Sequence, residues 1–466
     1  MFIKNVLGTF GTEQLLLLLN SATSVLIARV LGPENLGVFS LVTTFPILVA
    51  GFANIGIPQA NIYFIGKKRN ALSDVSSNSL IFSIIIGLIA IAICYSLRDY
   101  VLKTLLKGVD AIYLLSIIPM IPLILLNYFL LSMLRGTGRF GLFNFGRLFS
   151  SLLRFVGLVF ALTILSSGIW GAILTVIAAT ALTSAYYVLI VSNFAGFKRK
   201  FNLPLAKNSV IYGLKSYLQN LFGFLQYRLD LFLIAFFLGK DKVAYYAVAA
   251  AVAGMIWHIP DSIGKVLFPK LSSTGKTEDI HHITSIVCRH TIFVTGIAVL
   301  MLFATSEFLI KGIYGIEYTH AIRPLLILLP GVVMMSIYKV LARDFSSRNR
   351  QQISVAAAAS GLTLNVVLNI LLIPQLGITG AALSSTVSYS ATSGMLLLFF
   401  LKESSSSLKE TVLMARGDFG VYTDLLSKFR SKVSHQCKRK PLLTMTGKAF
   451  GLKKYRHRES GDETTG

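Results

Sequence analysis

The chain has 466 residues, of which 54% are hydrophobic and 14% are charged, and its formal net charge is +24 at pH 7. Soluble domains carry about 25% charged residues, so this composition excludes a water-soluble globular protein. The hydrophobic residues fall into blocks of about 20, the length that crosses a bilayer core. The sequence therefore predicts an all-α polytopic membrane protein.

Hydropathy predicts about twelve transmembrane helices joined by short connections, with no soluble domain inserted between them. We place them at residues 9–30, 37–65, 77–97, 111–134, 147–166, 169–193, 210–238, 243–267, 284–310, 321–342, 353–374 and 378–401. The first apolar run has no small-residue cleavage site directly after it, so we interpret it as a retained span rather than a signal peptide.

Lysine and arginine in the loops predict the orientation of these spans, because positive residues stay on the cytoplasmic side. The loops after even-numbered spans hold fifteen Lys and Arg residues, and those after odd-numbered spans hold about eight. We therefore expect a cell (cytoplasmic) membrane protein with both termini in the cytoplasm.

Residues 402–466 form a predicted basic tail with fourteen Lys and Arg and seven acidic residues. Such a tail could contact anionic lipid headgroups, although a simple topology anchor is the favoured interpretation. Much of the net positive charge lies in loops that membrane topology explains, so the charge gives no support for nucleic-acid binding.

A short motif occurs twice: GIWGAIL at residues 168–174 and GITGAAL at residues 377–383, an offset of 209. Two further pairs keep offsets of 207 and 208 residues: ARVLGPENLGVF (28–39) with AFFLGKDKVAYY (235–246), and Pro122 and Arg135 with Pro330 and Arg343. A nearly constant offset indicates duplication of a six-span unit. Because six is even, the two copies cross the membrane in the same sense and should be related by a pseudo-two-fold axis along the membrane normal.

The duplication predicts four parts of the chain. They are an N-terminal six-helix lobe (1–193), a cytoplasmic connector (194–209), a C-terminal six-helix lobe (210–401) and the basic tail (402–466). Two such lobes with a cleft between them could open first to one side of the membrane and then to the other.

The pattern, together with ARVLGPENLGVF after the first span, YRLDLFLIAFFLG (227–239) and LGITGAALSSTVSYS (376–390), resembles the polysaccharide-biosynthesis (O-antigen, Wzx-type) flippases of the MATE-like MOP superfamily. The resemblance covers about residues 1–400. It implies transport of a polyprenyl-(pyro)phosphate-linked oligosaccharide, with membrane lipids and glycan-assembly enzymes as further partners.

Charged residues inside predicted spans are functional candidates, because a charge at the bilayer centre costs about 2.5–3.5 kcal/mol on insertion scales. A pyrophosphate headgroup needs cationic donors, and the planar fork of arginine grips two phosphate oxygens at once. We expect Arg154 and Arg228 to contact the diphosphate, followed by Lys215. Arg29 is also a candidate, although snorkelling and packing at the turn are favoured for it.

Four acidic or imidazole side chains are candidates for ion coupling: Glu13, Asp230, His258 and Asp261. His258 and Asp261 are three residues apart and share a helix face beside Pro260, which bends a helix, so the pair could take up a proton or a cation. For each candidate a structural role is the favoured alternative: an interfacial carboxylate for Glu13, inter-helix packing for Asp230, and a satisfied polar patch for the His258–Asp261 pair.

Three functions remain to be weighed. A lipid-linked oligosaccharide flippase agrees with the cationic spans. A cation-coupled multidrug or small-molecule antiporter of the same fold would need an acid-rich cavity, whereas here intramembrane bases outnumber acids. A membrane glycan polymerase or ligase would need a large extramembrane loop or paired carboxylates. No phosphate-binding loop or zinc-binding motif is found in the sequence, so we expect no enzyme activity, cofactor or metal.

Overall fold

The structure is a computed structural model that describes residues 2–67, 72–198, 201–272, 277–404 and 406–420. Within the described helices, a few side chains, Lys215 among them, lie outside this description. Most of the predicted tail, residues 421–466, is also outside it. Residues 1–413 form one compact unit, and the segment that follows them forms a second.

The described chain is almost entirely helical. Its helices are α1 (Phe2–Ala53), α2 (Ile57–Lys67), α3 (Leu72–Ser96), α4 (Arg98–Thr104), α5 (Ala111–Ile117), α6 (Ile121–Gly136), α7 (Phe140–Val159), α8 (Gly168–Phe194), α9 (Leu203–Leu238), α10 (Lys240–Met255), α11 (His258–Ser272), α12 (Thr277–Phe308), α13 (Ile322–Ser347), α14 (Gln351–Leu376), α15 (Ile378–Ser404) and α16 (Leu408–Val412). Eleven helical stretches in the described residues are long and apolar enough to cross a membrane.

The first of these stretches contains two membrane passes. Helix α1 breaks at Gly32, where φ is 73° and ψ is 173°. At the equivalent position of the second repeat, Gly239 between α9 and α10 has φ 84° and ψ 172°. Glycine adopts this positive φ without a Cβ clash. The two hairpins therefore have the same backbone geometry at the offset that the sequence repeat predicts, and the expected twelve passes are present.

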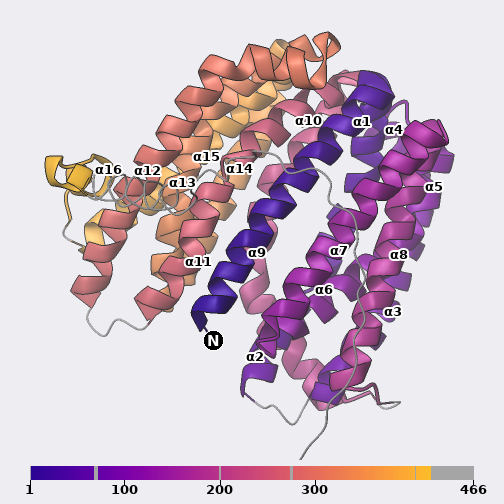
Figure 1. The fold of residues 1–466 in the computed structure, drawn as a ribbon, viewed down its shortest axis with the longest axis horizontal. Helices are drawn as coiled ribbons and strands as arrows, with labels where there is room; N and C mark the ends of the chain where they lie inside the picture. The colour runs from indigo at the N-terminus through magenta and orange to yellow at the C-terminus, as the bar shows by residue number, and fades with distance from the viewer. Residues whose placement is uncertain (1, 68–71, 199–200, 273–276, 405, 421–466) are drawn as a thin grey trace, which may run out of the picture. The chain divides into compact units, whose positions relative to one another are not determined.

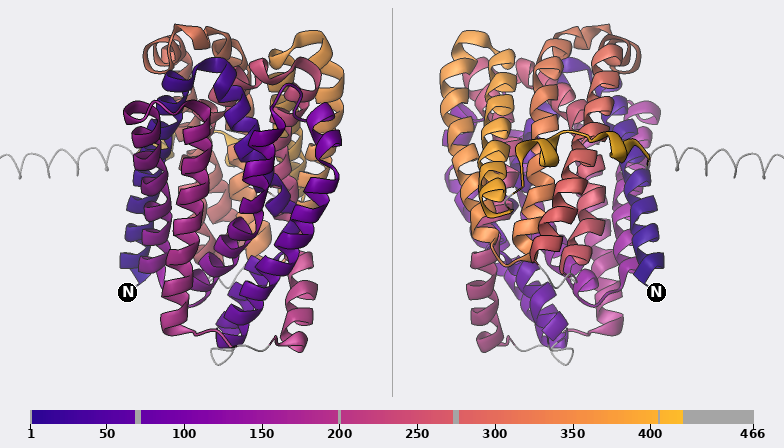
Figure 2. Two further views of the ribbon diagram at one scale, coloured as in Figure 1. Left: turned by 90° about the vertical axis from the view of Figure 1, so that its right-hand side faces the viewer. Right: turned by 90° about the vertical axis from the view of Figure 1, so that its left-hand side faces the viewer.

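The helices pack as two bundles, as the sequence predicted. In the N-lobe (α1–α8), α1 packs on α7, α3 on α6, and α7 on α8; in the C-lobe (α9–α15), α13 packs on α15 and α12, and α14 on α15. Figure 1 shows the indigo-to-magenta helices of the N-lobe beside the orange helices of the C-lobe, with α1 and α9 between them, and Figure 2 shows the same bundles from two sides.

Direct contacts join the lobes at the upper end of Figure 1, where α1 meets α10. A Cβ added to Gly37 would lie 2.3 Å from the carbonyl oxygen of Lys240, so the two backbones touch there. The Tyr318 hydroxyl also donates to the carbonyl of Ala28 (2.8 Å). At the lower end, the Tyr217 hydroxyl on α9 donates to the carbonyls of Gly51 (2.8 Å) and Phe52 (2.7 Å).

The outward faces of the bundles carry large exposed apolar side chains. On α12, Leu300 and Phe308 are 69% and 79% exposed, and on α3, Leu88 and Ile89 are more than half exposed. Soluble monomers rarely show apolar surfaces of this extent, so these faces suit contact with lipid.

At three places the helix boundaries in the structure differ from those predicted from the sequence. The expected span 37–65 is interrupted at residues 54–56, where Ile55 and Gly56 both have positive φ, and it continues as α2. The expected span 243–267 is divided into α10 and α11 by a turn at Ile256 and Trp257. Helix α9 begins at Leu203, before the expected start of the second lobe at 210, because Asn202 caps it by accepting from the Leu205 N–H.

Candidate functional site: a cationic cavity between the lobes

A cavity of about 940 Å³ lies between the two lobes. Its wall is formed by α1, α6, α7 and α8 of the N-lobe and by α9, α10, α13 and α15 of the C-lobe. Both α1 and α10 face it along much of their length. The cavity therefore lies at the interface between the two lobes.

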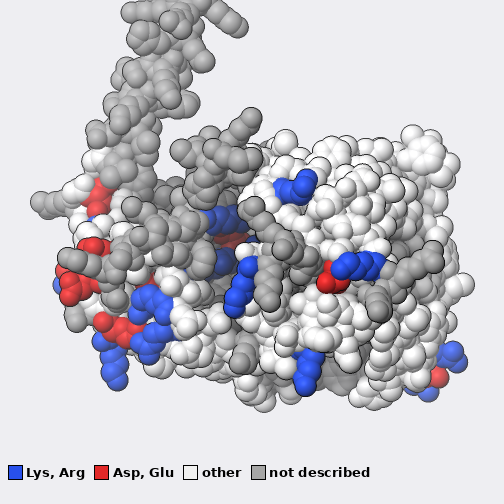
Figure 3. All heavy atoms as spheres, turned by 90° about the horizontal axis from the view of Figure 1, so that it is seen from below, with Lys and Arg blue, Asp and Glu red and all other residues white. Residues whose placement is uncertain are grey.

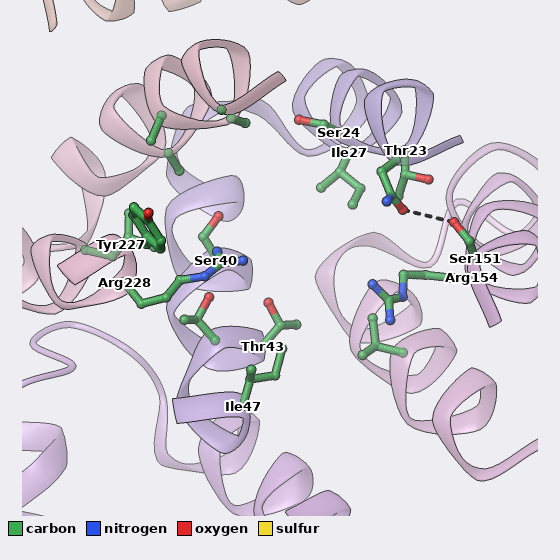
Figure 4. Close-up of a pocket in the computed structure, with 18 of the residues that line it drawn as sticks. Thr23, Ser24, Ile27, Ser40, Thr43, Ile47, Ser151, Arg154, Tyr227 and Arg228 are labelled. Atoms are coloured by element: carbon green, nitrogen blue, oxygen red, sulfur yellow. Dashed lines mark hydrogen bonds between the residues drawn. The ribbon is translucent and has the colours of Figure 1, made fainter. Parts of the chain in front are cut away.

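Three arginines line this cavity, and two of them, Arg154 and Arg228, come from opposite lobes. Figure 4 shows Arg154 of α7 and Arg228 of α9 pointing into it from opposite sides. Among the described residues, neither guanidinium makes an ion pair or a hydrogen bond, and the Nε atom of Arg154 is buried without a partner. The structure thus brings together the two arginines that the sequence favoured for contact with a diphosphate, and it leaves their donors free.

The N-lobe wall is rich in hydroxyl and amide groups. They are Asn20, Thr23, Ser24, Ser40, Thr43, Thr44, Asn127, Ser150, Ser151, Thr180 and Thr183. Two of them are joined, since the Ser151 hydroxyl donates to the Asn20 side-chain oxygen at 2.9 Å. Figure 4 shows Ser151 beside Arg154. The facing stretch of the C-lobe, on α10, presents mainly alanine and valine. The two walls of the cavity therefore differ in chemistry.

Glu13 lies in the lower part of α1 and forms ion pairs with two basic side chains. Its carboxylate pairs with Arg147 of α7 (2.5 Å) and with Lys265 of α11 (2.9 Å). Arg147 also lines the cavity, although in the sequence it is one of the fifteen basic residues of the loops after even-numbered spans. Because α1 and α7 belong to the N-lobe and α11 to the C-lobe, this ion-pair network joins the lobes.

Figure 3 shows the face of the molecule at this lower end, with blue lysine and arginine side chains distributed around it and acidic side chains beside several of them. The basic side chains on this face correspond to the lysine and arginine residues that the sequence places in the loops.

Asp230 is 2% exposed and is the centre of a buried polar cluster in the C-lobe. Its carboxylate accepts hydrogen bonds from Tyr246 (2.6 Å), Asn369 (2.8 Å) and Ser385 (2.5 Å). Asn365 donates to Ser385 (3.3 Å), and the side-chain oxygen of Asn369 is buried without a partner among the described residues. Asp230 also borders the cavity, so the cluster connects that space with the interior of the C-lobe.

The other candidates are placed differently from the expected site. The carboxylate of Asp261 accepts two hydrogen bonds from Lys339 of α13 (2.7 and 2.8 Å), and in the described residues neither a hydrogen bond nor an ion pair joins it to His258. The Arg29 guanidinium donates to the carbonyls of Gly312 and Ile313 (2.7 Å for the latter), and this arginine does not line the cavity. The side chain of Lys215 lies outside the described residues.

Comparison with known proteins supports the fold and gives the family. The sequence pattern of the family described as "Polysaccharide biosynthesis protein" matches residues 3–275. A "Putative O-antigen transporter" of Shigella flexneri is 25% identical over 378 residues, 78% of this chain and 88% of that protein. A "Probable low-salt glycan biosynthesis flippase Agl15" of Haloferax volcanii is 23% identical over 195 residues, 41% of each chain.

Two solved structures show the same fold. The structure "Lipid II flippase MurJ, inward closed conformation" has a TM-score of 0.73 and 18% identity, covering 86% of this chain and 90% of that one. An inward-facing multidrug resistance MATE family transporter of the MOP superfamily has a TM-score of 0.64 and 17% identity, covering 84% and 94%. The match to more than half of the sequence shows that the chain belongs to the polysaccharide biosynthesis protein family.

Proposed function

We propose that this protein moves a polyprenyl-(pyro)phosphate-linked oligosaccharide across the cytoplasmic membrane by alternating access of its two lobes. One observation carries the proposal: Arg154 and Arg228 face a single cavity from opposite lobes, and neither has an anionic partner among the described residues. The relatives named as an O-antigen transporter and a glycan flippase support the same substrate class.

The physical argument rests on the position of these charges. A guanidinium inside a membrane protein is costly unless an anion or a set of acceptors compensates it. Arginine binds phosphate oxygens through two parallel N–H donors, and this bidentate contact is stronger than a neutral hydrogen bond. An anionic phosphate headgroup in the cavity would supply the acceptors that the two arginines lack.

The cavity also suits the size of such a headgroup. Pockets for small molecules are typically about 300–1,000 Å³, and this one, at about 940 Å³, lies at the upper limit. It could accept a phosphate together with sugar rings, while the hydrocarbon chain stays in the bilayer.

Asp230 is the coupling residue we propose for the C-lobe. Its carboxylate, the Asn369 side-chain oxygen and the Ser385 hydroxyl lie in one buried cluster. Oxygen donors of this kind suit a hard monovalent cation, and a buried carboxylate can alternatively carry a proton. Binding of either in one state of the cycle would link transport to an ion gradient.

In this proposal, both termini lie in the cytoplasm, because the lysine- and arginine-rich loops lie at the end of the bundle where α1 begins. Enzymes that assemble the oligosaccharide are the expected partners of the transporter. The protein itself acts as a transporter and not as an enzyme.

A cation-coupled multidrug antiporter is the alternative, and the buried carboxylate of Asp230 beside the cavity is the observation that favours it. For such a protein, neutralising the acids should abolish transport, whereas neutralising the cavity arginines should have little effect.

The test is the sidedness of lipid-linked oligosaccharide in cells that lack the gene, probed with an impermeant sugar-modifying reagent. We expect the glycan to accumulate on the cytoplasmic face. The wild-type gene should reverse the accumulation, Arg154→Ala and Arg228→Ala should fail to do so, and Arg154→Lys should restore it in part.

Arg98→Ala is the matched control, since Arg98 pairs with the neighbouring Asp99 and does not line the cavity. It should behave as the wild type. An unchanged pool with normal sidedness in the deletion strain would refute the flippase, and efflux of cationic drugs that depends on Asp230 would establish the antiporter.

A further inference from the structure

A break in a membrane helix places Trp257 in the wall of the cavity. The helical hydrogen bonds of α10 end in a turn at Ile256 and Trp257, and α11 restarts at His258. Pro260, in the first turn of α11, has no N–H to donate, so it fits a new helix start rather than a continuous helix. Interrupted helices at the middle of transporters often border the substrate site.

Trp257 belongs to a cluster of three aromatic rings, all of which line the cavity. Its ring centroid is 4.7 Å from that of Tyr227 and 5.7 Å from that of Tyr389, and the two tyrosines are 5.8 Å apart. Tilted and edge-to-face pairs at these distances are favourable. The three side chains, which we call the aromatic wall, therefore pack together on the C-lobe side, and Tyr389, at 4% exposed, is the most buried of them.

The indole of Trp257 is held in place but is left with a free donor. The Lys339 ammonium lies 5.3 Å from the ring centroid and is itself fixed by Asp261. The indole Nε1, however, is buried and has no hydrogen-bond partner within the described part of the chain. An unpaired buried donor is costly, and a hydrogen bond to a ligand that reaches it would remove that cost.

The aromatic wall begins directly beside the cationic site. Tyr227 precedes Arg228 in α9, and Figure 4 shows both side chains in the same part of the cavity. In a lipid-linked oligosaccharide the first sugar is joined to the phosphate, so a sugar-binding surface should adjoin the phosphate-binding residues. The N-lobe wall opposite carries hydroxyl and amide groups, Ser40, Thr43 and Asn127 among them.

We propose that the aromatic wall, with Trp257 at its centre, binds the sugar part of the substrate. The apolar C–H face of a pyranose packs against the aromatic rings, and the Trp257 Nε1–H donates to a sugar oxygen. The hydroxyl groups of the same sugar face the polar side chains of the N-lobe. This assignment rests on the proposed function, and it makes Trp257 a specificity residue for the glycan.

Intrinsic fluorescence tests the proposal without changing Trp257. The chain has two tryptophans, and the other, Trp170, packs against Tyr113 at a tilted angle and does not line the cavity. In full-length Trp170→Phe protein, all indole fluorescence comes from Trp257. Two probes are added to it: polyprenyl pyrophosphate without sugar, and the same carrier with its oligosaccharide, purified from the deletion strain.

We expect the oligosaccharide-bearing probe to change the Trp257 emission and the sugar-free carrier to leave it unchanged, while both bind. In separate binding measurements by thermophoresis, Trp257→Leu should weaken the oligosaccharide-bearing probe about tenfold, the upper range for loss of an aromatic contact. Trp257→Leu should leave the affinity for the sugar-free carrier unchanged. Trp257→Phe, which retains a ring but loses the N–H, should give an intermediate affinity.

Three other outcomes are distinguishable. Equal emission changes with both probes would show that the wall contacts the hydrocarbon chain or the phosphate, and would overturn the assignment. Binding of both probes with no emission change and no effect of Trp257→Leu would also overturn it, and would leave the cationic site intact. If neither probe binds the Trp170→Phe protein or the wild type, the proposed function itself fails.

Discussion

The ion-pair network at Glu13 gives a prediction about how the lobes separate. Its carboxylate is 8% exposed and bridges Arg147 of its own lobe to Lys265 of the other lobe. Because this bridge lies at the lower end of the bundle, breaking it should favour separation of the lobes there. We expect Glu13→Gln and Lys265→Gln to make the cavity more accessible from that end.

The size of the expected change in accessibility follows from how exposed the paired side chains are. The Lys265 side chain is 46% exposed, so the pair it makes is screened and contributes about 0.5–1 kcal/mol. Lys265→Gln should therefore shift the equilibrium between closed and open lower ends about two- to fivefold. Glu13→Gln removes both pairs and leaves two cations facing each other, which costs about 1–3 kcal/mol and should shift the same equilibrium at least about fivefold.

The assay is the labelling rate of a cysteine in the cavity by an uncharged, water-soluble maleimide. Ser40→Cys is suitable, since Ser40 lines the cavity, and it is placed in a chain from which Cys94, Cys288 and Cys437 have been removed. Labelling should accelerate in the order wild type, Lys265→Gln, Glu13→Gln. High salt should reduce the difference between wild type and Lys265→Gln, because it screens half-exposed charges.

Lys311→Gln is the matched control, because Lys311 pairs with Glu307 within one helical stretch and joins no second lobe. Its labelling rate should equal that of the wild type. If Glu13→Gln and Lys265→Gln also label at the wild-type rate, the network does not hold the lobes together and the reasoning is wrong.

Three further predictions concern the C-lobe and the contact between the lobes. If Asp230 binds a cation or a proton, sodium ions or mildly acidic pH should raise the unfolding temperature of the wild type above its value in choline chloride at neutral pH. Asp230→Asn should abolish that rise. An unfolding temperature of the wild type that changes under neither condition would exclude coupling at Asp230. Gly37→Leu should weaken the α1–α10 contact by about 1–3 kcal/mol, because the new Cβ would lie 2.3 Å from the Lys240 carbonyl oxygen. The variant should still insert in the membrane, but it should fail to restore normal glycan sidedness in the deletion strain. Arg348→Gln should destabilise the fold by about 3–5 kcal/mol in thermal unfolding, since it leaves the fully buried carboxylate of Asp344 without its cation; an unchanged unfolding temperature would show that Asp344 is neutral.

The sequence alone determined the membrane passes and their duplication. Blocks of about twenty apolar residues must become helices in a bilayer, because every backbone polar group has to be paired within the segment. The repeated hairpins could also be predicted from the sequence. Gly168 and Gly377 both have positive φ, at 58° and 65°, and this local conformation favours glycine. Arg154 and Arg228 could be identified because an intramembrane charge avoids lipid and must face the interior.

Only the tertiary structure decided which partner each charge has. The spacing of His258 and Asp261 predicted a pair on one helix face, but Asp261 binds Lys339, which is 78 residues away in the chain. Glu13 likewise forms an ion pair with Lys265 of the other lobe. Trp257 lines the cavity at the turn where α10 has ended and α11 has not yet begun. Such contacts depend on how helices far apart in sequence pack together, and helical periodicity describes only the faces of a single helix.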